Sequence, residues 1–232
     1  MTKLKNMLIA AIAIAALSTN VLAGSFGVGG AATFASISGT GTETEGTEAN
    51  TANSGTAQNT VWIGSVFAEY TLDGDHGLTF GIDYIPGSAD VNSKNLSRTD
   101  LEQSIEGTNT RTNTSVKRTA QATVENHLTY YVELPLTGGL YGKAGYVEMD
   151  VITSENIGAT KAYGNTSVDG YMYGVGYKVQ TAGAIYYKLE GTHTEFDTLT
   201  LSESGQTAGS AANRISADLD VTKATLALGY KF

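Results

Sequence analysis

Hydrophobic and polar residues alternate with a period of two along about eight segments of this chain. One segment has Leu78, Phe80, Ile82 and Tyr84 on one face and Thr79, Gly81 and Asp83 on the other. Alternation of this kind is typical of β-strands whose two faces meet different surroundings. The chain is therefore predicted to be all-β.

The connections between these segments alternate strictly between short and long. Three are short turns, at Asp73–Gly77, Pro135–Gly139 and Gln180–Gly183. Four are long polar segments, at residues 39–59, 87–117, 154–167 and 197–213. Outer-membrane barrels alternate periplasmic turns and extracellular loops in this way, so we predict a transmembrane antiparallel up-and-down β-barrel of eight strands. Residues 113–123 also alternate, which predicts a strand that extends beyond the membrane.

Charged residues fall on the face opposite the apolar residues in most of these strands. A lysine or arginine that faces lipid near the midplane costs about 2 to 4 kcal/mol, so the apolar face is expected to meet the membrane. An eight-stranded barrel has a lumen that side chains fill, so charges on the other face should pair there. The predicted lumen charge network is Glu69, Asp83, Glu125, Glu133, Lys143, Lys178, Lys188 and Glu190. The alternative is a gate, in which exchanging pairs open a narrow ion path.

The strand that begins near Leu140 is less regular. Leu140, Ala144 and Tyr146 alternate in one phase, and Val147, Met149 and Val151 alternate in the other. A β-bulge near Tyr146 would explain this change of phase.

The last strand ends the chain on an aromatic residue. Its residues Thr225, Ala227, Tyr230 and Phe232 resemble the C-terminal recognition strand of bacterial outer-membrane β-barrels, although Ala227 stands where that strand usually has Gly. The resemblance implies that these residues are an assembly signal. It also implies the barrel-assembly machinery and periplasmic chaperones as partners during export.

The N-terminus predicts export. Lys3 and Lys5 precede an apolar run from Met7 to Leu17 and a small-residue cleavage site that ends at Ala23. We therefore predict a signal peptide over residues 1–23 and one barrel domain over residues 24–232. Loss of the two lysines changes the formal charge from −9 to −11. An acidic chain lacks the basic surface that nucleic-acid binding requires. The chain has no Cys, so its fold uses no disulfide.

The mature chain as a whole resembles the small eight-stranded barrels of the OmpA transmembrane, OmpX and opacity-protein kind. That resemblance implies a bacterial outer-membrane protein with periplasmic termini, lipid as its surroundings and long extracellular loops. Proteins of this kind use their loops in adhesion, surface protection or envelope integrity. An extracellular ligand or surface would therefore meet the loops at residues 39–59, 87–117, 154–167 and 197–213.

Catalytic chemistry has little support in the sequence. Outer-membrane lipid A deacylases resemble such a barrel and use a His with a nearby Ser and an acidic partner, but neither His127 nor His193 has a Ser at that spacing. Asp73-Gly74-Asp75 lacks the remaining ligands of a calcium loop. We predict no catalytic residue, no metal and no cofactor. The two functions left open are a non-catalytic surface, structural or adhesion protein and a narrow channel for ions or small solutes.

Overall fold

The computed structural model describes residues 24–44, 52–73, 77–92, 96–106, 110–156, 162–204 and 212–232. The predicted signal peptide lies outside these residues. Within them every regular element is a β-strand, and no helix is long and apolar enough to cross a membrane. The strands are β1 (Gly24–Thr44), β2 (Ala52–Leu72), β3 (Thr79–Asp90), β4 (Leu96–Glu106), β5 (Thr110–Pro135), β6 (Leu140–Asn156), β7 (Thr166–Gln180), β8 (Ile185–Phe196), β9 (Leu199–Ser202) and β10 (Arg214–Lys231).

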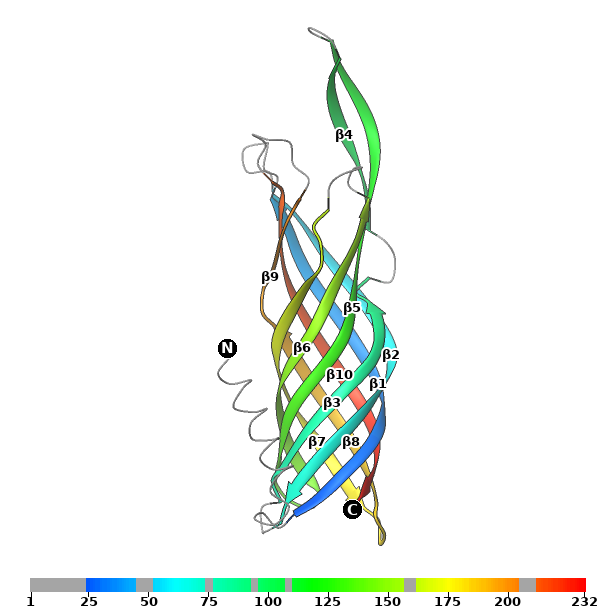
Figure 1. Cartoon of the computed structure of the whole chain (residues 1–232), viewed down its shortest axis with the longest axis vertical. Coiled ribbons are helices and arrows are strands. Elements are labelled where there is room, and N and C mark those ends of the chain that lie inside the picture. The colour runs from blue at the N-terminus through cyan, green and yellow to red at the C-terminus, as the bar shows by residue number, and fades with distance from the viewer. Residues whose placement is uncertain are drawn as a thin grey trace.

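The strands form one antiparallel sheet that closes into a barrel (Figure 1). The order around the barrel is β1, β2, β3, β5, β6, β7, β8 and β10, and β10 pairs with β1 to close the ring. The short β9 follows β8 along the same partner, β10. The remaining strand, β4, pairs with β5 in a hairpin that rises past the barrel. Eight strand positions make the wall, so the predicted fold class is confirmed.

The two ends of the barrel differ. At one end, called the turn end, residues 73–78, 136–139 and 181–184 join neighbouring strands. Phe232 also lies there, and its backbone N–H donates to the carbonyl of Phe26 (2.8 Å). At the opposite end, called the hairpin end, strands extend into all four segments that were predicted to be long loops.

The loop prediction is therefore wrong over much of its length. Strand β1 continues to Thr44 and strand β2 begins at Ala52, and both residues lie inside the predicted 39–59 loop. Most of the 87–117 segment belongs to β4 and β5, and β6, β7 and β9 extend into the other two segments. The reason is that these polar segments are rich in Thr, which fits a paired strand well. The expected extension of the strand over residues 113–123 is confirmed, because β5 is one strand of 26 residues.

Long strands make the barrel taller than a membrane. A transmembrane strand needs about 9 to 11 residues, whereas β1 and β2 have 21 residues each. We therefore divide the barrel into a membrane half, next to the turn end, and a projecting half, next to the hairpin end.

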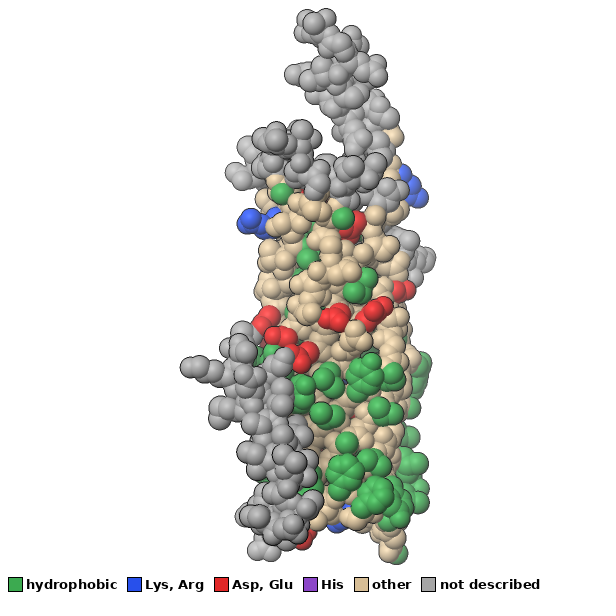
Figure 2. All heavy atoms as spheres, viewed as in Figure 1, with side chains coloured by type: hydrophobic (Ala, Val, Ile, Leu, Met, Phe, Trp, Pro, Cys, Tyr) green, Lys and Arg blue, Asp and Glu red, His purple; other side chains and the backbone are tan. Residues whose placement is uncertain are grey.

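Exposed hydrophobic side chains surround the membrane half and form an apolar band (Figure 2). The band comprises Phe26, Val28, Phe34, Trp62, Val66, Tyr84, Leu134, Leu140, Tyr171, Tyr173, Val175, Tyr177, Val179, Ile185, Tyr187, Leu189, Leu226, Leu228, Tyr230 and Phe232. Figure 2 shows acidic side chains in a row along its edge. Three carboxylate pairs face each other across strands: Glu125 with Asp150, Glu148 with Asp169, and Glu195 with Asp220. Carboxylates do not belong in hydrocarbon, so these pairs mark where the membrane half ends.

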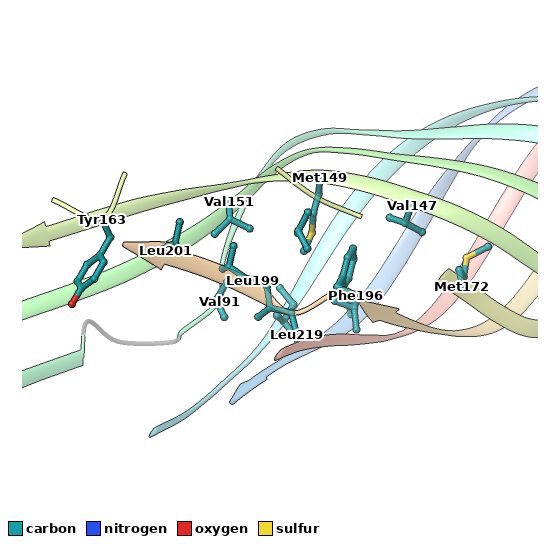
Figure 3. Packing of buried hydrophobic residues seen from close by; sticks show 14 of the residues in the cluster. Val91, Val147, Met149, Val151, Tyr163, Met172, Phe196, Leu199, Leu201 and Leu219 are labelled. Atoms are coloured by element: carbon teal, nitrogen blue, oxygen red, sulfur yellow. The ribbon is translucent and has the colours of Figure 1, made fainter. Parts of the chain in front are cut away.

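In the projecting half the hydrophobic residues point inward instead (Figure 3). On β6, Val147, Met149 and Val151 are all buried in one interior cluster, which also contains Ile37, Val221, Leu199 and Leu201 from the neighbouring strands. The residues of β6 pair with β7 without interruption from Leu140 to Val151, so the predicted bulge near Tyr146 is wrong. The hydrophobic residues change phase because the surroundings change: apolar residues face lipid below the acidic row and face the lumen above it.

Candidate functional site

The lumen of the membrane half is filled by charged side chains that form one network, called the plug. Lys188 of β8 lies at its centre, paired with Glu69 of β2 and with Glu133 of β5, whose Oε1 is 2.6 Å from the lysine Nζ. Lys143 of β6 pairs with Glu190 (2.7 Å), and Lys178 of β7 pairs with Glu69 (3.0 Å). Five strands thus contribute to a set of three cations and three anions.

Aromatic side chains complete the plug. The hydroxyl of Tyr131 donates to Glu69 (3.1 Å), and that of Tyr141 donates to Glu190 (2.5 Å). The Lys143 ammonium lies 3.9 Å from the centre of the Tyr131 ring, and the Lys178 ammonium lies 4.2 Å from that of Tyr186. These contacts give the buried charges hydrogen bonds and cation–π partners in addition to their ion pairs.

Each aromatic ring of the plug lies against a glycine on the neighbouring strand. Tyr131 is directly opposite Gly81, Tyr141 opposite Gly176, Tyr186 opposite Gly229, and Phe67 opposite Gly29. A Cβ atom added at any of these four glycines would lie 2.1 to 2.3 Å from a ring atom. The glycines therefore provide the space in which the rings lie flat across the sheet. This packing fixes the direction of the tyrosine hydroxyls.

One of the eight predicted lumen charges is misplaced. Glu125 faces outward, because its neighbour Val124 packs against the interior cluster. The register of β5 against β6 shifts between Glu125 and Leu128, where Asn126 has a φ of 52°. This β-bulge reverses which residues of β5 point inward. The inward and outward alternation from Leu128 to Leu134 therefore does not continue to Glu125.

A lysine that the sequence reading missed lies in the lumen instead. Lys223 of β10 is buried and, together with Asp83, lines a small polar cavity of about 30 Å³ on the hairpin side of the plug. The Asp83 carboxylate accepts a hydrogen bond from Ser65 (2.8 Å). With Lys223 in place of Glu125 the lumen set has four acids and four lysines. Lys223 is two residues before the inward Thr225, so strand alternation alone was sufficient to predict that it points into the lumen.

The histidines do not form a catalytic arrangement in the described part of the chain. The Nδ1 atom of His193 is 2.9 Å from the Thr222 hydroxyl, but its Nε2 atom is 3.7 Å from Glu195, beyond hydrogen-bond reach. His193 and Thr222 are directly opposed on β8 and β10, which is an ordinary cross-strand pair. Neither ring nitrogen of His127 has a hydrogen-bond partner. Among the described residues, no group of three or more His, Asp or Glu could hold a metal ion.

The predicted assembly-signal residues lie on two faces of β10. Thr225 points inward and shares a hydrogen bond with the Thr33 hydroxyl (2.9 Å), and Ala227 is buried beside Phe67 and Tyr186. Tyr230 and Phe232 face outward with their rings 5.0 Å apart, and Phe232 also contacts the ring of Phe26. Their role in export stays a prediction.

Comparison with known proteins identifies the family. The model described as "Outer membrane protein beta-barrel domain" matches residues 7–232. The chain belongs to this family. Membership of the outer-membrane β-barrel family places the protein in the bacterial outer membrane, where the apolar band meets lipid. A search of curated proteins finds no match.

Solved structures of other outer-membrane proteins share the architecture at low sequence identity. Neisserial surface protein A is 12% identical, with 89% of this chain and 97% of that chain covered and a TM-score of 0.37. The attachment invasion locus protein Ail of Yersinia pestis, in complex with the heparin analogue sucrose octasulfate, is 13% identical, with 88% and 99% covered and a TM-score of 0.35. OprG from Pseudomonas aeruginosa is 11% identical, with 91% and 97% covered and a TM-score of 0.45. Likeness at this level transfers no function to an outer-membrane β-barrel.

Proposed function

We propose that this protein is a non-catalytic surface protein of the outer membrane, in which a plugged barrel anchors strand hairpins that project beyond the lipid. The observation that carries the proposal is the contrast between the halves. The plug fills the lumen of the membrane half with mutually paired charges. Beyond the apolar band, paired strands continue on most of the wall and end in polar hairpins.

The proposal includes an orientation. The turn end, with Phe232, faces the periplasm, and the hairpin end faces the surroundings of the cell. Outer-membrane barrels place short turns inside and long connections outside, which supports this orientation. The β4–β5 hairpin then extends furthest from the membrane (Figure 1) and is the element that meets a ligand or another surface.

A narrow channel is the competing function. Lumen charges favoured it in the sequence, but six of these charges lie within ion-pair distance of one another. Each would have to give up a buried partner before a path opened, which is costly. The packing of rings against glycines holds the same groups in place.

Shortening the β4–β5 hairpin tests the proposal. Residues 98 and 118 are directly opposed, so replacing residues 99–117 by Asn-Gly closes a tight hairpin on the same ladder. We expect normal amounts of folded barrel and reduced adherence of cells to a surface. A matched variant with residues 99–117 in scrambled order separates the effect of the sequence from that of the length.

Two further measurements decide between the functions. If the shortened variant leaves adherence, envelope integrity and surface exposure to protease all unchanged, the surface role is wrong. Purified protein in planar bilayers should show no discrete conductance. A reproducible single-channel current would favour the channel instead.

A further inference from the structure

The barrel wall has a gap between β2 and β3. The two strands pair from Thr71 opposite Thr79 to Val66 opposite Tyr84. Among the described residues their backbone pairing stops there. Beyond that point β2 continues along β1, and β3 continues along β5. The two strands meet again where the Asn59 side chain donates to the carbonyl of Asp90 (2.7 Å). Residues 60–65 of β2 therefore face the gap.

The sequence of β3 explains why pairing stops. Pro86 has no backbone N–H to donate to a ladder, and Gly87 has a φ of 150°. The register of β3 against β5 also shifts between Ile85 and Ser88. The gap is thus encoded by a Pro-Gly bulge.

A cavity of about 250 Å³ passes through this gap. Its lining includes the inward residues Val61 and Ile63 of β2 and also the outward residues Trp62 and Gly64. Since both faces of one strand line the cavity, it crosses the wall. Trp62 is 74% exposed in the apolar band and lies against Phe34, so the opening faces lipid at the band's edge.

Inside the wall the cavity is lined mainly by apolar residues. A second cavity, of about 260 Å³, lies one step further along the same strands. Ile37, Val124, Met149 and Val221 line the first, and the residues two positions on, such as Val151 and Leu219, line the second. The two cavities share no lining residue. The first, called the chamber, is slightly smaller than typical small-molecule sites of roughly 300 to 1,000 Å³.

Two buried polar side chains lie at the floor of the chamber, and among the described residues one lacks a hydrogen bond and the other lacks an ion pair. His127 is 9% exposed and lines the chamber, and both of its ring nitrogens are without a hydrogen bond. Lys223 is 8% exposed and lines the chamber too, and no ion pair of its ammonium occurs among the described residues. A buried imidazole without a hydrogen bond is unfavourable, and the ammonium of Lys223 adds a positive charge beside it, so the two groups together point to a polar, anionic ligand atom.

We propose that the chamber is a binding site for an unbranched aliphatic carboxylate that enters from lipid through the gap between β2 and β3. Its carboxylate binds at Lys223 and His127, and its alkyl chain lies among the apolar residues of the chamber. The charge of Lys223 selects an anionic head, and the opening toward lipid selects a chain that partitions into membranes. This site is independent of the role proposed for the hairpins.

Trp62 is the one tryptophan of the chain and lies at the entrance, so its fluorescence reports binding directly. The probe is decanoate with bromine at its terminal carbon, a quencher of tryptophan, added to the protein in lipid nanodiscs. Probe dissolved in lipid gives quenching that does not saturate. We expect an additional saturable component from the chamber. Absence of a saturable component in the folded protein would overturn the proposal.

Two variants locate the site. Val221→Phe fills the chamber from β10 and should remove the saturable component, whereas Leu226→Phe, on the lipid face of the same strand, should keep it. Folding of both variants is checked by heat-modifiable migration in gels. Saturable quenching that persists in folded Val221→Phe would place the probe elsewhere and overturn the proposal.

Lys223→Met tests the head group and does not depend on filling the chamber. The half-saturation concentration of the brominated decanoate should rise about tenfold, since a charge-assisted contact is lost. The matching brominated decanol, which is neutral, should bind the variant and the parent equally. Equal weakening of both probes, or of neither, would show that Lys223 does not bind the carboxylate.

Discussion

The membrane half and the projecting half are built from the same strands and bury the same inward face, but this face is ionic in the membrane half and apolar in the projecting half. On β8, Leu189 is exposed to lipid and Lys188 and Glu190 are buried in the plug, whereas Phe196 further along the same strand is buried in an apolar interior. The membrane half is thus apolar outside and ionic inside, and the projecting half has the arrangement of a soluble barrel. Strand pairing continues across the boundary because the backbone hydrogen bonds between strands form in the same way whether the outer face meets lipid or water.

The comparison shows what each half relies on for its stability. In lipid, burying apolar residues in the lumen gains little, so specificity comes from ion pairs and close packing. In water, the hydrophobic effect stabilises the projecting half directly. Substitutions should therefore have effects that depend on the half in which they are made.

The largest effect is expected in the plug. Lys188→Met leaves the carboxylates of Glu69 and Glu133 facing each other without their shared cation. Removing one partner of a buried ion pair costs about 3 to 5 kcal/mol, so the free energy of unfolding should fall by an amount of that order. Urea unfolding in detergent micelles measures it. Lys231→Met, at an exposed lysine near the end of β10, is the control, and equal stability of the two variants would show that the plug does not stabilise the barrel.

A lysine on the outer face should distinguish the halves next. Leu189→Lys places a charge in the apolar band and should cost about 2 to 4 kcal/mol. Thr200→Lys is also outward, on β9 between the buried Leu199 and Leu201, and should change stability by less than about 0.5 kcal/mol. Yields of folded, membrane-inserted protein compare the two. If both insert equally well, the outer face at Leu189 does not meet lipid.

Overpacking at a glycine should have a smaller effect. Gly229→Ala brings a Cβ to 2.1 Å from the Tyr186 ring, whereas Gly191→Ala, on the adjacent strand, meets no atom within 4 Å. The first substitution should lower the free energy of unfolding by about 1 to 3 kcal/mol, because the ring must move out of the plug. The second should be nearly neutral. Equal urea midpoints would mean that the ring can shift without disturbing its neighbours.

The sequence predicted the parts of the fold that depend on alternation. The predicted faces were correct in the membrane half for Tyr84, Lys188 and Glu190, because lipid and lumen impose opposite polarity on alternate residues. Strand ends at the hairpin end could not be read, since polar Thr-rich segments form strands only when a partner strand is present. The bulge near Tyr146 was predicted because the apolar face was assumed to meet lipid along the whole strand.

The candidate site was predictable by parity except where a bulge intervened. Lys223 could have been found from Thr225 and Ala227, which share its face. Nothing in the alternation of β5 showed that Asn126 adopts a positive φ, so Glu125 was assigned to the wrong face. The chamber depends on a missing ladder between β2 and β3, and Pro86 was its one visible sign in the sequence.

The smallest effect concerns Glu125, and it tests where the parity of β5 reverses. Glu125 faces outward and lies directly opposite Asp150, so Glu125→Gln removes a like-charge contact across the strands. Asp150 keeps its hydrogen bonds from Asn126 (2.8 Å) and Ser167 (2.7 Å). We expect the free energy of unfolding to stay within about 0.5 kcal/mol of the parent or to rise slightly. Glu133→Gln, on the same strand below the bulge, takes a charge from the plug and should destabilise the barrel clearly. Equal losses of stability in urea unfolding would show that Glu125 points into the lumen and that β5 has no bulge at this point.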